Sequence, residues 1–298
     1  MLKFFKTWTL PISMLAGAIG YFVFANVTFL EPTKPFMYTL IAYLTPFLIF
    51  AQLLLTFCKI SVRELMPSPW HGWLLLIQAV SSLVLAALLL WLPMREEYPA
   101  VITGKLGGSA SSLTTYTLLS NLLAAIVVPL VFPLVEPHAE ITFFAAFLKI
   151  LGKVFPLLLF PFFLALFLRR FIPPIHRFLA GLRDMAFYLW AVALAIVTGQ
   201  TVKSLVNSEA EIYVEILIAL GGLITCIAQF YWGKRIGKKY NDRISAGQAL
   251  GQKNTVLAIW MSYTYLNPLS SVGPGSYVLW QNIFNSYQLW KKRKNELE

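Results

Sequence analysis

Charged residues are scarce in this 298-residue sequence: they make up 12% of it, about half of the roughly 25% that soluble domains carry. The composition is 58% hydrophobic and the mean hydropathy is +0.69, which excludes an ordinary cytosolic protein and a disordered one. Only two cysteines are present, Cys58 and Cys226, and both lie in apolar runs without zinc-ligand spacing. A disulfide scaffold and a zinc ribbon are therefore excluded as well.

Acidic residues are also few, 13 against 24 Lys and Arg. None lies deep inside a long uncharged run; Asp184 and Glu215 come closest, at the entrances to two runs. The chain thus lacks the embedded carboxylate that usually relays protons or binds a hard cation within a membrane. It also lacks the clustered histidines, paired aspartates or Ser–base pair of an integral-membrane enzyme. We therefore expect no enzyme activity, no metal centre and no cofactor.

Long uncharged runs are abundant instead. A helix that spans a bilayer needs about 20 mostly apolar residues, and the sequence predicts an all-α integral membrane protein with ten transmembrane helices. Two runs, Leu106–Val135 and Asn254–Trp290, are too long for one span, and each is expected to hold a half-helix, a turn and a full helix. The predicted spans lie near residues 8–29, 36–57, 70–92, 97–115, 118–135, 147–170, 182–203, 212–233, 241–261 and 274–291.

The basic residues alternate between the two sets of span ends. Seventeen Lys and Arg fall on the side of both termini and three on the opposite side, which by the positive-inside rule places both termini in the cytoplasm. We therefore expect a multi-pass protein of the cell or inner membrane, surrounded by the lipid bilayer. The net charge of +11 follows from this topology, so no nucleic-acid partner is expected.

Two predicted spans, the fourth and the ninth, are interrupted by glycine and polar residues at matching places in the two halves. Leu106-Gly107 in TGKLGGSASSL and Leu250-Gly251 in AGQALGQKNTVL are 144 residues apart. Such segments can unwind in mid-membrane beside a cavity, where freed backbone groups and half-helix ends bind ions and anions. The pattern predicts two inverted five-helix repeats whose discontinuous helices 4 and 9 cross mid-membrane. A small-residue packing face would explain the first segment, but not the polar residues of the second, which are Gln248, Gln252, Lys253 and Asn254.

At these residues the chain resembles the bile acid:sodium symporter family. The family's fourth-helix motif, Pro-Gly-Gly-x-x-Ser-Asn, is similar to residues 106–112, and its ninth-helix motif, Glu-x-Gly-x-Gln-Asn, is similar to residues 249–254. The segment from Pro274, which includes Asn282 and Asn285, also resembles the family. The resemblance implies a panel of helices that moves against a core. The panel would comprise residues 1–68 and 138–205, the core residues 69–137 and 206–291, and a basic cytoplasmic tail residues 292–298.

The departures from the family concern its ions. The family's glutamate, shared by two sodium sites, aligns with Ala249, the glutamine of the second site with Lys253, and the fourth-helix asparagine with Ser112. Sodium coupling of the family's kind is therefore not expected. Lys253 would instead act as a tethered cation, held by backbone carbonyls with Gln252, Gln248 or serine side chains. It could also exchange a coupling proton, because desolvation favours the neutral amine. The alternative is a lysine that reaches cytoplasmic water.

The expected substrate contacts come from the resemblance as well. They would be hydroxyl and amide groups suited to a carboxylate or sulfonate, on Ser109, Ser111, Ser112, Asn254 and Thr255. In the alternative, such serines and threonines bond their own backbone or a neighbouring helix. Lys105 is a second charge near membrane depth, either in the site or reaching the outer cavity.

These features favour a secondary transporter of small or amphipathic organic anions that works by alternating access. Na⁺ or H⁺ would be the candidate coupling ion, with Lys253 as a built-in cation. Two alternatives stay open. One is a sodium-independent exporter or uniporter of the auxin-efflux type; the other is a membrane binding protein or sensor that does not transport.

Overall fold

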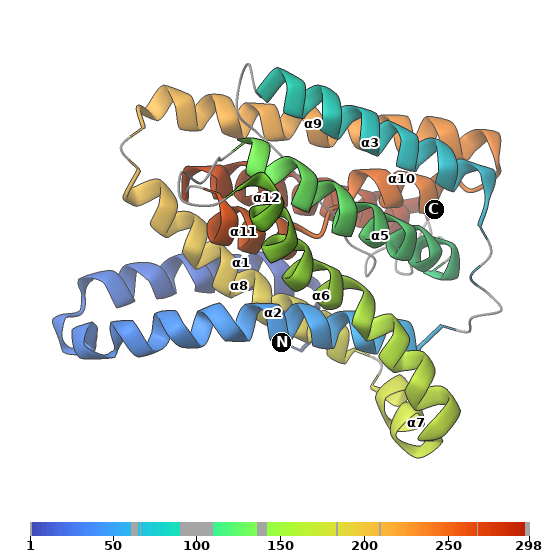
Figure 1. The fold of residues 1–298 in the computed structure, drawn as a ribbon, viewed down its shortest axis with the longest axis horizontal. Coiled ribbons are helices and arrows are strands. Elements are labelled where there is room, and N and C mark those ends of the chain that lie inside the picture. Colours follow the sequence, from blue (N-terminus) through green and yellow to red (C-terminus); the bar gives the residue numbers. More distant parts are fainter. Residues whose placement is uncertain are drawn as a thin grey trace.

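Helices account for every regular element in the part of the chain that the structure describes, which comprises residues 2–60, 65, 67–89, 110–135, 142–182, 184–208, 210–266 and 268–295. The structure is a computed structural model (Figure 1). In chain order the helices are α1 (Leu2–Asn26), η1 (Thr28–Thr33), α2 (Lys34–Cys58), α3 (Pro69–Leu89), α5 (Ala110–Val135), α6 (Phe143–Phe171), α7 (Pro173–Gly181), α8 (Met185–Val206), α9 (Ile212–Lys239), α10 (Arg243–Gly251), α11 (Thr255–Tyr265), η3 (Pro268–Ser271) and α12 (Val272–Asn295).

Several helices have the length and apolar surface of membrane spans. Large apolar side chains face outward, such as Phe29, which is 86% exposed, and Ile224, which is 68% exposed. Such an apolar surface is stable in contact with lipid, whereas its exposure to water is unfavourable. The chain is therefore an all-α, multi-pass membrane protein. Within the described residues, six segments are long and apolar enough to cross a bilayer: Thr9–Asn26, Thr28–Cys58, Thr115–Pro133, Phe143–Phe171, Met185–Val206 and Ile212–Lys239.

One predicted boundary is wrong. The fourth span was expected over 97–115 and the fifth over 118–135, but α5 is a single helix that continues through residues 116 and 117. This stretch has neither Gly nor Pro, and the hydroxyl of Tyr116 donates to Gln78 Oε1 on α3 over 2.7 Å. A neighbouring helix, and not an unwound turn, thus satisfies the polar group. Residues 97–109 lie outside the described part of the chain.

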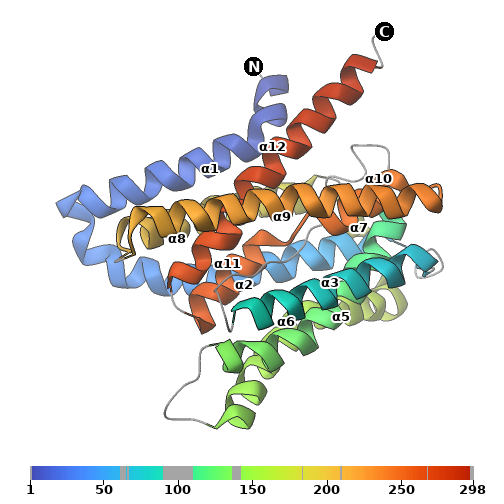
Figure 2. The same ribbon diagram turned by 90° about the horizontal axis from the view of Figure 1, so that it is seen from above.

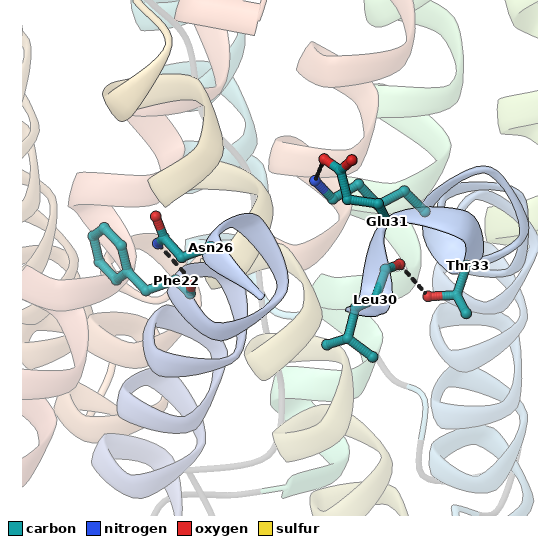
Figure 3. A network of polar contacts seen from close by, with 6 residues as sticks. Phe22, Asn26, Leu30, Glu31 and Thr33 are labelled. Carbon is teal, nitrogen blue, oxygen red and sulfur yellow. Dashed lines mark hydrogen bonds and ion pairs between the residues drawn. The ribbon is translucent and has the colours of Figure 1, made fainter. Parts of the chain in front are cut away.

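The short helix η1 reverses the chain between α1 and α2 (Figure 3). Asn26 Nδ2 donates to the carbonyl oxygen of Phe22 over 2.7 Å. Thr33 Oγ1 donates to the carbonyl oxygen of Leu30 over 2.6 Å. Glu31 forms a 2.9 Å ion pair with the lysine three residues later. These local bonds satisfy carbonyls at the two helix ends, so a tight turn connects the antiparallel pair.

Helix α8 packs against α1 and α2, and α2 also packs against α6; α1, α2 and α8 form the lower layer in Figure 1. Glycine sets the closest approach. A Cβ atom at Gly17 of α1 would overlap the carbonyl oxygen of Ala195 on α8. A Cβ atom at Gly199 would lie 3.1 Å from the carbonyl oxygen of Gly17. Small residues at both positions let the two backbones touch, as is usual for helices packed within a membrane.

A second group contains α3, α9, α10 and α12, with α3, α9 and α10 forming the upper layer in Figure 1; α5 contacts α3 and α10 of this group and packs more extensively against α6 of the first. Gly233 and Gly237 on α9 are four residues apart and face α10. A Cβ atom at Gly233 would lie 2.5 Å from the carbonyl oxygen of Ala246, and one at Gly237 would lie 2.5 Å from the Cβ atom of Ala246. On its other side α10 contacts Trp70 and Tyr116, from α3 and α5. The short helix α10 is therefore clamped between longer ones.

Helix α11 lies between the two layers. It contacts α2, α8 and α12, and nine of its 11 residues are buried. Its apolar side chains belong to the same core cluster as residues of α2, α6 and α8. Figure 2 shows that α1 and α12 project their terminal ends from one side of the bundle. The central position of α11 places the chain segment before it deep within the protein.

Candidate functional site

The helix interruption predicted near Gly251 is present. α10 ends at Gly251 and α11 begins at Thr255, and between them Gln252 has an extended backbone with φ −106° and ψ 120°. The side chain of Asn254 then accepts a hydrogen bond from the backbone N–H of Leu257 over 3.2 Å. This is the usual N-cap arrangement, which starts a new helix with an asparagine. Residues Gln252–Asn254 are thus a non-helical link between two short helices.

Helix α12 supplies the groups that hold this link. The hydroxyl of Tyr277 donates to the carbonyl oxygen of Gly251 over 2.7 Å. Gln281 Oε1 accepts from the backbone N–H of Lys253 over 2.9 Å. Gln281 Nε2 lies 3.4 Å from the carbonyl oxygen of Lys253 and 3.3 Å from Thr255 Oγ1. Unwound backbone is tolerated at depth only where such partners exist, so α12 is what makes the interruption possible.

Lys253 is buried within this link. It is 2% exposed, although it stands between α10 and α11 and not at a helix end that meets water. No Asp or Glu is among the buried residues in the part of the chain that the structure describes. A buried ammonium costs much free energy unless polar groups or an anion surround it. The alternative of a lysine tip in cytoplasmic solvent does not describe this conformation.

Several amide groups around the link are buried without partners. Gln252 is 0% exposed, and neither its Oε1 nor its Nε2 has a hydrogen-bond partner. Gln248 Nε2 donates to Asn285 Oδ1 over 3.2 Å, but Gln248 Oε1 and Asn285 Nδ2 have no partner. Asn282 Oδ1 is unpartnered too, although this side chain faces α1, where its Nδ2 donates to Met14 Sδ over 3.7 Å. Each such atom costs about 1–3 kcal/mol. Donors and acceptors left open beside a buried cation are the groups that would bind water or a polar ligand.

The structure brings five of the predicted site residues together: Gln248, Gln252, Lys253, Asn254 and Thr255. Ser111 and Ser112 lie in the first turn of α5, and their side chains are outside the described part. One turn after Ser112, Tyr116 contacts α10 at Ala249 and Leu250. The N-terminal part of α5 thus approaches α10. Lys105 and Ser109 lie outside the described residues.

Two residues of the site were not predicted, Tyr277 and Gln281. Their signal was present in the sequence: Tyr277, Gln281 and Asn285 recur every four residues in a run that is apolar apart from Asn282. This spacing places them on one face of a helix. A second missed network joins α3 to α5, where Gln78 Nε2 lies 3.4 Å from Ser120 Oγ. Neither pattern reveals from sequence alone which helix it will face.

The described residues contain no cluster of three or more His, Cys, Asp or Glu side chains suited to a metal ion. The chemistry that this part of the chain offers is therefore that of neutral amides, hydroxyls, backbone carbonyls and one buried ammonium. Such a set is suited to anions and polar molecules. No protein-family model matches the sequence, and no curated protein matches it either.

Proposed function

We propose that this protein is a secondary carrier of small or amphipathic organic anions, similar to the bile acid:sodium symporter family, and that it works by alternating access. The observation that carries the proposal is the buried Lys253 in the non-helical link between α10 and α11. A cation beside unpartnered amides and two half-helix ends is what an anionic group would require at membrane depth. The proposal includes ten spans in two inverted repeats.

The anion would bind next to the link. Its carboxylate or sulfonate would accept from the ammonium of Lys253 and from the Nε2 donor of Gln252, which has no partner in the structure. Asn254, Thr255 and the serines at the start of α5 would add hydroxyl and amide contacts. Charge-assisted hydrogen bonds of this kind are about twice as strong as neutral ones.

Coupling would differ from that of the related symporters. Sodium sites in membranes favour carboxylates, and the described residues place every Asp and Glu outside the buried core. Lys253 would occupy the place of a sodium ion as a permanent cation. If it releases its proton when the anion leaves, transport would be coupled to H⁺; if it stays charged, the protein would be a uniporter or exchanger.

Movement would occur where α8 meets α12. Ser271 Oγ donates to Ser204 Oγ on α8 over 3.0 Å, and Gly275 of α12 lies directly against Thr201 of α8. Small and hydroxyl-bearing residues form an interface with few interlocking side chains, which suits sliding. The panel would comprise α1, α2, α6 and α8, and the core the remaining long helices.

The orientation follows from charge. The ends of α6 and α9 that carry Arg169, Arg170, Lys238 and Lys239 lie toward one end of the bundle in Figure 1, whereas η1 lies at the other. We infer that the basic end, with both termini, faces the cytoplasm of a cell or inner membrane.

The test is uptake by proteoliposomes that contain the full-length protein, with Na⁺, H⁺ or no gradient imposed. A panel of labelled carboxylates and sulfonates is offered, and protein-free liposomes are the control. Uptake that is independent of Na⁺ supports the proposal. Uptake that requires Na⁺ would contradict the proposed coupling, and binding without flux would identify a sensor. Neither binding nor flux for any anion would overturn the proposal.

A further inference from the structure

We propose that Lys234 on α9, Arg243 on α10 and Lys291 on α12 form a binding site for the phosphate group of an anionic membrane lipid. The proposal goes beyond transport and does not depend on it. Three helices that pack together each contribute one cation, because α9 packs against both α10 and α12. Such a group differs from the scattered lysines of an ordinary helix end.

Packing holds Lys234 in one position. Its aliphatic chain lies against Gly247 of α10, where an added Cβ atom would be 2.5 Å from the Cγ atom of Lys234. Its ammonium lies over the ring of Phe284, 5.2 Å from the centroid, and 6.0 Å from the centroid of Phe230. The two rings are themselves stacked with centroids 4.6 Å apart. A half-buried lysine fixed by a glycine contact and two aromatic rings forms a preorganised point charge.

Two more cations lie close to that point. Arg243 and Lys291 are near enough to act on Lys234 electrostatically, and both repel its charge. Among the described residues, none of the three makes an ion pair with a carboxylate. Like charges grouped in this way favour an anion placed between them. Lysine and arginine together are the usual ligands of a phosphate group.

The surroundings indicate a lipid as the source of the phosphate. Tyr231 and Trp232, just before Lys234, are 55% and 49% exposed, and their rings contact each other with centroids 5.5 Å apart. Arg235 Nη1 lies 3.4 Å from the hydroxyl of Tyr231. Exposed aromatic side chains next to cations are typical of the headgroup level of a bilayer. Ile227 and Ile224 continue the exposed apolar surface along α9, where acyl chains would lie.

The experiment measures lipid binding by the purified full-length protein in native mass spectrometry, with phosphatidylglycerol and phosphatidylcholine compared. We expect wild type to retain phosphatidylglycerol preferentially. The Lys234→Gln/Lys291→Gln variant should bind it more weakly, by about fivefold for each cation removed. The matched control is Arg169→Gln/Arg170→Gln, which removes two exposed cations from the same end of the bundle and should leave the preference unchanged. If Lys234→Gln prevents folding, Lys291→Glu, at an exposed position, carries the same test.

Three outcomes would overturn the proposal. Equal retention of the two lipids by wild type would show that the cations do not select a headgroup of net negative charge. An equal loss in the Arg169→Gln/Arg170→Gln control would show a general effect of charge. Displacement of phosphatidylglycerol by millimolar inorganic phosphate, lost in the Lys234→Gln/Lys291→Gln variant, would assign the site to a soluble phosphate and remove the lipid as its source.

Discussion

The hydroxyl of Tyr277 donates a 2.7 Å hydrogen bond to the carbonyl oxygen of Gly251, the last residue of α10. That carbonyl belongs to a helix end buried within the protein, where water cannot satisfy it. Gly251 also lies flat against the ring of Phe230, so that any Cβ atom there would overlap the ring. The end of α10 is therefore defined by α12 through a hydrogen bond and by α9 through packing.

Removing the hydroxyl should destabilise the protein. Tyr277→Phe leaves the Gly251 carbonyl unpartnered at a site where Tyr277 is 0% exposed, and we expect a loss of about 1–3 kcal/mol in the free energy of unfolding. Chemical denaturation in detergent measures it. Tyr213→Phe is the matched control, because Tyr213 is 58% exposed and should change stability little. Equal stability of Tyr277→Phe and wild type would mean that this bond does not hold the end of α10.

Gln281 fastens the other side of the link, and its removal should affect both stability and substrate binding. Gln281→Leu deprives the backbone N–H of Lys253 of its acceptor, so we expect a loss of about 1–3 kcal/mol and weaker anion binding. Gln229→Leu is the control, since the side-chain Oε1 of Gln229 already lacks a partner. Thermal unfolding and equilibrium binding are measured on the same samples. A Gln281→Leu protein with unchanged stability would contradict the assigned role.

The contact between α9 and α10 should depend on glycine. Gly233→Ala places a Cβ atom 2.5 Å from the carbonyl oxygen of Ala246. Overpacking of this kind costs about 1–3 kcal/mol. At Gly152 on α6 an added Cβ atom meets nothing within 4 Å, so Gly152→Ala should be neutral or stabilise the helix by about 0.5–1 kcal/mol. The unfolding temperatures of the two variants are measured relative to wild type. Shifts of the same sign and size in both would contradict the close contact at Gly233.

The sequence predicted the helical interruption at Gly251 because that signal is local. Glycine followed by polar residues and an N-capping asparagine lies within a few positions, and the structure places α10, the link and α11 there. The partners of the link could not be predicted in the same way. Gln281 is 28 residues from Lys253, and only the fold determines which face of α12 meets which backbone group.

The opposite error occurred in the first half of the chain. The expected boundary between the span over 97–115 and the span over 118–135 lies at residues 116–117, yet α5 continues through them. The side chain of Tyr116 finds its partner on α3, as its bond to Gln78 shows. A polar residue in an apolar run therefore indicates either an unwound segment or a contact between helices. Gly251 is followed by polar residues and an N-capping asparagine, whereas the residues beside Tyr116 include neither glycine nor proline.

Lys253→Met should strongly weaken the proposed anion binding and still allow folding. A charge-assisted hydrogen bond contributes about 1.5–3 kcal/mol, which corresponds to about 10- to 100-fold in affinity. Lys153→Met is the matched control, because Lys153 is an exposed lysine on α6. Size-exclusion profiles verify folding, and proteoliposome uptake is measured across a range of pH values. Uptake by Lys253→Met at the wild-type rate, with an unaltered pH dependence, would remove Lys253 from the site.

Variants of Gln252 and Gln248 should distinguish a role in ligand binding from a role in structural support. They lie four residues apart and both are 0% exposed, but only Gln248 makes a side-chain hydrogen bond, to Asn285. Gln248→Met should therefore destabilise the protein by about 0.5–1.5 kcal/mol, the usual worth of one such bond. Gln252→Met removes two unpartnered polar atoms, so it should leave the stability of the substrate-free protein unchanged or raised.

Uptake should be affected more by Gln252→Met than by Gln248→Met, which is the reverse of the order expected for stability. If the open amide of Gln252 serves the anion, Gln252→Met loses uptake even though the protein is as stable as wild type. A purely structural role would make stability and uptake fall together in both variants. Unfolding free energies in detergent and uptake by proteoliposomes, measured on the same preparations, distinguish the two. A Gln252→Met protein that is less stable than Gln248→Met would indicate that the amide has a partner in the folded protein, and would remove it from the binding site.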